Sequence, residues 1–325
     1  MGKYLITLPF SALGWIGQRG AAAVAISVVI GMLLPAFSSY ARPYLSEAVF
    51  VLLVLAFMRV DTAAILLRLK RPTLLLASTL WMLLALPLLA VVLVHATGLI
   101  ALRPEVMLAV FIATAAPSVM SAPAFIYLMG LDGALSLTVL VIGIMATPLT
   151  APLIGVLMLG PDLPLSSLDL GLHLALLLGG SYGTAWIIRK LAGEARISTA
   201  RYQIDGLNVM VLFFFAIAAM DGVAASFLER PVFTTVIAAL TFVLAFTQIV
   251  LTLLVFSKSS RADAFVIAHS SGARNMGLLV AALGGTLPDA AWLWFALAQL
   301  PIYTLPYILR PFGRRYCGLV QAPST

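Results

Sequence analysis

The stretch HSSGARNMG, residues 269–277, sets an arginine inside a long apolar run that extends over about residues 263–285. A charged side chain near the bilayer centre costs roughly 2.5–3.5 kcal/mol on insertion scales, so such groups usually face a partner or a watery cavity. Arg274 follows Asp263 by about eleven residues, or some 16 Å at the helical rise, which is roughly mid-membrane. The stretch therefore predicts a polar site inside a membrane-spanning segment.

The composition around this stretch is that of a polytopic membrane protein. Of the 325 residues, 62% are hydrophobic and only 10% are charged, and the mean hydropathy is +1.11. The net charge of +7 comes from basic residues in short connectors, which orient spans, and we read no nucleic-acid binding from it. With one cysteine, Cys317, and three histidines, we expect no metal site, no cofactor and no enzymatic constellation. We expect a multi-pass protein of the cell membrane, in contact with the lipid bilayer.

Charged or Pro/Gly-rich breaks divide the chain into ten segments that are long enough to cross a bilayer. They are apolar all round, which favours helices over a barrel. The segments cover about residues 20–38, 44–60, 72–96, 104–130, 133–160, 166–191, 203–227, 231–256, 263–285 and 290–310. Residues 4–15, which are too short to span, predict an interfacial helix.

The basic residues predict the orientation of these spans. Fifteen of the 19 Lys and Arg residues fall on one side of the predicted topology and three on the other, Arg274 being the remaining one. The excess marks the cytoplasmic side, which holds both termini.

The two halves of the chain share an outline. In each half a segment broken by proline or glycine is followed by a segment with paired prolines; the breaks lie at 115–123 and 270–277, and the proline pairs at 148/152 and 301/306. Because each half has five spans, the second half inserts upside down relative to the first, as in many secondary transporters. We therefore expect an all-α fold of two inverted five-helix repeats, residues 1–160 and 161–325, in which helices four and nine are broken and cross.

The polar residues of the ninth segment give the site its chemistry. Ser270 and Arg274 are four residues apart, as are Ser271 and Asn275, so two neighbouring stripes of one helix are polar. The guanidinium could grip a carboxylate bidentately; alternatively, Arg274 is a structural charge paired with Asp221 of the seventh segment. His269 precedes the patch and is a candidate proton carrier.

Several features carry a resemblance to a known family. They are the ten spans, the basic connector LLRLKRP at 66–72, the opening of the fifth segment at Ala134–Ser136 with its proline pair, and the positions of Gly272, Asn275 and Gly277. In this order they resemble the bile acid:sodium symporter family, within the superfamily of arsenite and auxin efflux transporters. The resemblance implies a panel domain and a core domain, each with helices from both repeats, and transport of organic anions by alternating access.

The resemblance also assigns positions. Those matching the substrate site or a polar position of the tenth span are Ser121, Asn275 and Gln299; together with Arg274 they are the substrate-binding candidates. Ion-site or coupling equivalents are Ser136, His269, Ser270 and Ser271. Sodium-coupled members carry Glu where Ser270 stands, Gln at Arg274, a Ser-Asn pair at Ala122 and Pro123, and Gln at Met82.

These departures remove oxygen ligands and place a guanidinium where a sodium ion would bind. The resemblance and these departures together predict a secondary transporter of a small organic anion, a carboxylate or a bile-acid-like molecule, in which Arg274 stands in for the cation. Sodium coupling is doubtful, and the carrier is a uniporter, an exchanger or a proton-linked carrier. The alternative is a sensor or non-transporting relative, in which Arg274 is locked to Asp221.

Overall fold

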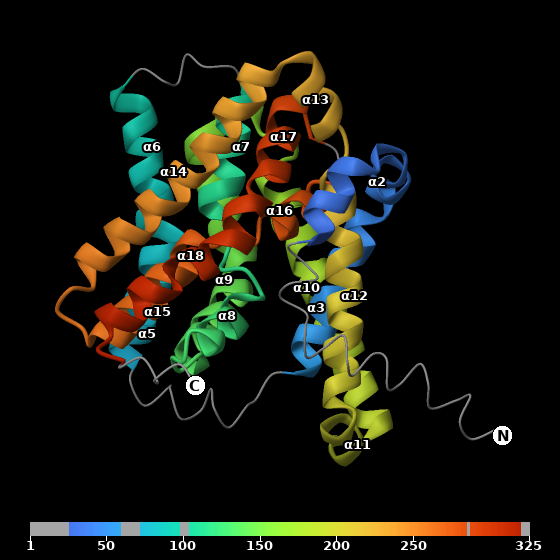
Figure 1. Ribbon diagram of the computed structural model, residues 1–325, viewed down its shortest axis with the longest axis vertical. Helices are drawn as coiled ribbons and strands as arrows, with labels where there is room; N and C mark the ends of the chain where they lie inside the picture. Colours follow the sequence, from blue (N-terminus) through green and yellow to red (C-terminus); the bar gives the residue numbers. More distant parts are fainter. Residues whose placement is uncertain (1–25, 60–71, 98–103, 285–286, 320–325) are drawn as a thin grey trace. The chain divides into compact units, whose positions relative to one another are not determined.

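The computed structural model describes residues 26–59, 72–97, 104–284 and 287–319, and the fold of these residues is all-α (Figure 1). Within these described ranges, seven helical segments are long and apolar enough to cross a membrane. Large apolar side chains on them are exposed, Leu149 and Leu191 each at 79%, which suits contact with lipid rather than with water. The seven segments are Pro35–Met58, Pro72–Ala96, Ala134–Asp162, Ser167–Ala192, Arg201–Glu229, Pro231–Val255 and Asp289–Tyr316. The chain is a multi-span helical membrane protein.

The described residues divide into two compact units, and each unit takes residues from both halves of the chain. Of the described residues, unit 1 comprises 26–59 and 175–234, and unit 2 comprises 72–97, 104–174, 235–284 and 287–319. The unit boundaries fall within the long helices α10 (Ser167–Ala192) and α14 (Pro231–Val255).

Unit 1 is built on α12, which packs against α2 and α3. Ion pairs join Arg59 to Asp205 at 2.8 Å and Arg42 to Asp221 at 3.0 Å. Besides parts of α10 and α14, the elements of this unit are helical residues 26–33, α2 (Pro35–Ala41), η1 (Arg42–Tyr44), α3 (Leu45–Met58), α11 (Glu194–Thr199), α12 (Arg201–Ala219) and α13 (Val223–Glu229).

Unit 2 is organised around α9 (Ala134–Leu159), which stays helical through Pro148 and Pro152 and lies beside α7, α8 and α15 (Figure 1). Its other elements, besides parts of α10 and α14, are α5 (Pro72–Leu80), the π-helix η2 (Trp81–Ala85), α6 (Leu86–Ala96), α7 (Pro104–Ala115), α8 (Ala122–Leu128), η4 (Gly160–Asp162), α15 (Arg261–Gly272), α16 (Met276–Ala282), α17 (Asp289–Leu297) and α18 (Gln299–Tyr316).

The differences from the predicted segments have local causes. The predicted fourth and ninth segments are absent from the seven because each is interrupted: α7 ends before Pro117 and α15 ends at Gly272. The predicted first and second segments contribute jointly to Pro35–Met58. The seventh segment contains a turn at Gly222, whose φ of +76° suits a residue without a Cβ. The predicted interfacial helix at 4–15 and most of the basic connector at 66–72 lie outside the described residues.

Candidate functional site

The interruptions of the fourth and ninth segments pair with each other inside unit 2. Ser118 and Arg274 form an antiparallel β-bridge. The Val119 amide donates to the Ala273 carbonyl at 2.8 Å, and the Asn275 amide donates to the Pro117 carbonyl at 2.8 Å. Backbone groups that leave a helix at membrane depth need partners, and here each break supplies them to the other. We call this pairing, residues 116–121 with 273–275, the crossover.

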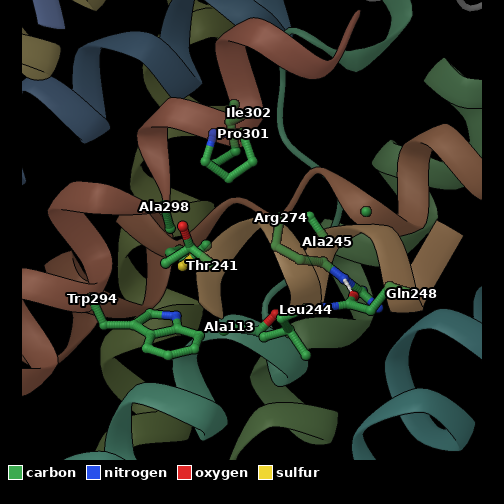
Figure 2. Close-up of a pocket in the computed structure, with 12 residues that line it drawn as sticks. Ala113, Thr241, Leu244, Ala245, Gln248, Arg274, Trp294, Ala298, Pro301 and Ile302 are labelled. Atoms are coloured by element: carbon green, nitrogen blue, oxygen red, sulfur yellow. Dashed lines mark hydrogen bonds between the residues drawn. The ribbon is translucent and has the colours of Figure 1, made fainter. Parts of the chain in front are cut away.

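Arg274 is held at the crossover by oxygen atoms from three other parts of unit 2. Its side chain is 1% exposed. Nε donates to Gln248 Oε1 at 2.7 Å, as Figure 2 shows, and Nη1 donates to the carbonyls of Met82 at 3.0 Å and Ala116 at 3.1 Å. These three acceptors, the oxygen cage, carry no formal charge. Hydrogen bonds rather than an ion pair therefore hold the guanidinium.

Proline explains why the Met82 oxygen is available. In the π-helix η2 the Leu86 amide bonds to the Trp81 carbonyl instead of to that of Met82. The next amide that could reach Met82 in π geometry belongs to Pro87, which has no N–H. The Met82 carbonyl thus has no donor in its own helix and points its lone pairs to Arg274.

Gln248 of α14 is the residue that the sequence reasoning missed. Its amide nitrogen lies 3.5 Å from the Ala113 carbonyl, which lacks the usual helical donor because position 117 is proline. Its amide oxygen is then directed to Arg274. Gln248 is 4% exposed, and a lone amide within the apolar run 231–256 was the available signal.

Hydroxyl pairs brace the α15 side of the crossover. Ser136 and Ser270 are joined at 2.8 Å, and Ser271 and Thr252 at 2.7 Å. Thr252 also accepts from the indole of Trp81 at 2.8 Å. The structure thus brings together Ser136 and Ser270, two of the positions that the resemblance assigned to ion coupling, as a neutral pair.

Five buried polar atoms at or beside the crossover have no hydrogen-bond partner among the described residues. They are Ser118 Oγ, Ser121 Oγ, His269 Nδ1, Arg274 Nη2 and Asn275 Nδ2. Buried polar atoms normally have partners, so a group of orphans on one feature is a candidate ligand site. His269 is 2% exposed and packs edge-on against Phe125, 6.4 Å between ring centroids.

The bonds of Arg274 restrict what it can bind. Nε has one hydrogen and Nη1 has two, and all three are used by the oxygen cage. A bidentate grip on a carboxylate needs two nitrogens on one edge of the guanidinium. In this conformation Nη2 alone is free, so the bidentate grip suggested by the sequence is not available.

Figure 2 shows residues that line a cavity beside Arg274, among them Gln248, Trp294 and Pro301. The volume of this cavity is about 10 Å³. That is the size of one water molecule, whereas sites for organic ligands measure roughly 300–1,000 Å³. This conformation is therefore closed around Arg274.

Two predicted site residues have partners elsewhere. Gln299 is buried, and its amide donates to the Phe295 carbonyl one turn earlier at 3.1 Å. Asp221, the predicted counter-ion of Arg274, accepts from Arg42 and from Ser39 within unit 1. In the structure Arg274 and Asp221 thus have different partners.

No protein-family model matches the chain, and a search of curated proteins finds no similar sequence. Among the described residues, no three His, Cys, Asp or Glu side chains gather in a way that could hold a metal ion.

Proposed function

We propose that this protein is a secondary transporter of a small organic anion, similar to the bile acid:sodium symporter family, in which Arg274 is a built-in cation. Ten spans, inverted repeats and cytoplasmic termini remain part of this proposal. The observation that carries it is the oxygen cage. Two backbone carbonyls and one amide oxygen converge on the guanidinium from η2, the fourth-segment break and α14.

Uncharged oxygen atoms gathered in this way are the ligands that hard cations take in proteins. Here the guanidinium occupies them, so a sodium ion has no free oxygen set at this point. Ser270 supplies a hydroxyl, bonded to Ser136, where sodium-coupled relatives have a carboxylate. Both features favour transport without the usual sodium sites.

The crossover itself supports anion binding. Arg274 supplies positive charge, and the unpartnered Asn275 Nδ2 and the hydroxyls of Ser118 and Ser121 supply donors beside it. Donors and a fixed charge at paired helix breaks are the arrangement that many transporters use for anionic substrates. The division into two units that each draw on both halves supports alternating access.

The small cavity favours a second candidate, a non-transporting or sensor-type relative. In that case the closed packing around Arg274 is permanent and no anion enters. The two candidates differ in a single property, which is the binding and movement of a substrate.

The test is ligand binding followed by transport. Purified protein is screened by thermal shift against carboxylates, bile acids, sulfonates and keto acids, because a ligand of the folded state stabilises it. Anions that raise the melting temperature are then assayed for uptake into proteoliposomes with and without a sodium gradient. We expect uptake that is indifferent to sodium; clear sodium dependence would contradict the built-in cation, and the absence of any stabilising anion would favour the second candidate.

Ser118→Ala provides a matched variant. Because Ser118 Oγ has no protein partner, its removal leaves the fold intact and weakens anion binding. The control is Ser181→Ala, which removes a buried hydroxyl that bonds only to its own helix at the Leu177 carbonyl. We expect this control to keep wild-type affinity for the anion.

A further inference from the structure

The buried charge of Arg274 has no carboxylate among its hydrogen-bond acceptors. Among the described residues, Arg274 is the one formally charged side chain that is buried. Its hydrogen-bond acceptors are neutral, as shown above. The described carboxylates of unit 2 lie at helix ends or between helices: Glu105, Asp169, Asp263 and Asp289 in the first turns of α7, α10, α15 and α17, Asp162 in η4, and Asp132 in the turn before α9.

An empty carrier with this arrangement holds one uncompensated positive charge at membrane depth. Moving such a charge through the bilayer is costly and depends on the membrane potential. A monovalent anion bound at the crossover cancels the charge, because Ser118 and Asn275 belong to the same backbone bridge as Arg274. The crossover of the loaded carrier then carries no net charge. The conformational change that moves the anion across the membrane therefore costs less free energy than the same change in the empty carrier.

We infer that the protein is an obligate exchanger of monovalent organic anions, with Arg274 as the residue that prevents return of the empty carrier. The inference rests on the proposed transport function and adds its mode and the charge of its substrate. One fixed charge matches one monoanion, so exchange of one monoanion for another moves no net charge. A dianion would leave one negative charge on the loaded form and make exchange sensitive to voltage.

The experiment compares loaded with empty proteoliposomes. The purified full chain is reconstituted, and uptake of labelled pyruvate and of labelled taurocholate is measured with the same unlabelled anion inside or with none. Each measurement is repeated with a potassium diffusion potential set by valinomycin. We expect uptake to be faster by at least about tenfold in loaded vesicles, given the cost of an uncompensated charge in the bilayer, and unchanged by the potential.

Arg274→Gln is the informative variant, since it keeps a side chain that can donate to the oxygen cage and removes the charge. Because the loss of the charge also weakens anion binding, we expect lower uptake overall, and we expect loaded and empty vesicles to take up the anion at the same rate. Should this variant fail to fold, the comparison of loaded and empty wild-type vesicles decides alone.

The outcomes distinguish a failure of obligate exchange from a failure of the proposed transport function. Equal uptake into loaded and empty vesicles overturns obligate exchange and leaves the transport function standing. Faster uptake in loaded vesicles that also varies strongly with the potential overturns the charge balance. No uptake of either anion under any condition counts against the proposed transport function itself.

Discussion

Gln248→Leu tests whether Gln248 holds Arg274 in place. The substitution removes the acceptor for Arg274 Nε at 2.7 Å and the amide beside the Ala113 carbonyl at 3.5 Å. A hydrogen bond to a charged group contributes about 1.5–3 kcal/mol, and a buried group left unpaired costs about 1–3 kcal/mol. Because Gln248 is 4% exposed and the 3.5 Å contact is long, we expect a loss of about 3–4 kcal/mol in the free energy of unfolding.

The assay is thermal unfolding of purified protein in detergent. At roughly 2–4 °C per kcal/mol for a chain somewhat smaller than this one, the melting temperature falls by about 5–10 °C. Gln248→Glu is the matched control, because it keeps an oxygen for Arg274 Nε, now within an ion pair, while it loses the donor that faces the Ala113 carbonyl. We expect this control to lose less stability than Gln248→Leu.

A double-mutant cycle with Arg274→Met isolates the interaction. Once the guanidinium is gone, Gln248→Leu leaves no charged donor unpaired, so its cost in the Arg274→Met background is smaller by about 1.5–3 kcal/mol. Additive losses in the double variant would refute the reasoning. A melting temperature of Gln248→Leu within about 1 °C of wild type would refute it as well.

Three further predictions concern the same region. A Cβ at Gly272 would clash with Ile249 Cγ1 and lie 3.0 Å from the Ala245 carbonyl oxygen, so Gly272→Ala lowers the free energy of unfolding by about 1–3 kcal/mol. Gly179→Ala, whose Cβ would meet nothing within 4 Å, leaves it unchanged, and thermal unfolding measures both. Arg274→Ala empties the oxygen cage. We expect added guanidinium to raise the melting temperature of this variant and to leave that of the wild type unchanged. An equal change in both melting temperatures would count against a specific site. Ser270→Glu combined with Arg274→Gln restores the residues that sodium-coupled relatives carry at these two positions. We expect sodium, but not lithium or choline, to raise the melting temperature of this double variant. If sodium has no selective effect, the cage is not a cation site.

Local sequence signals located the breaks of the fourth and ninth segments correctly. Proline removes a backbone donor at its own position, and glycine tolerates extended and turn conformations, so both act on the chain without help from distant residues. Both predicted breaks are present, at Pro117 and after Gly272. Proline by itself does not decide where a helix breaks, since α9 continues through Pro148 and Pro152.

The partners of Arg274 were beyond sequence reasoning. The sequence suggested Asp221 because opposite charges attract, and carboxylates are easy to find in a sequence. The acceptors observed in the structure are two backbone carbonyls and one amide oxygen. Every residue has a carbonyl, so the sequence does not show which ones lack a donor in their own helix.

The sequence by itself determined three properties of this protein. It crosses membranes as helices, two of its segments break at positions that the sequence locates, and a charge lies within one of these two segments. These properties follow from apolar length, from proline and from glycine, each of which acts locally. Only the tertiary structure decided that the two breaks pair with each other and that neutral oxygen atoms surround the charge. Those contacts join residues up to 192 positions apart, Met82 to Arg274, and they exist only once the helices pack and the freed backbone groups of one meet those of another.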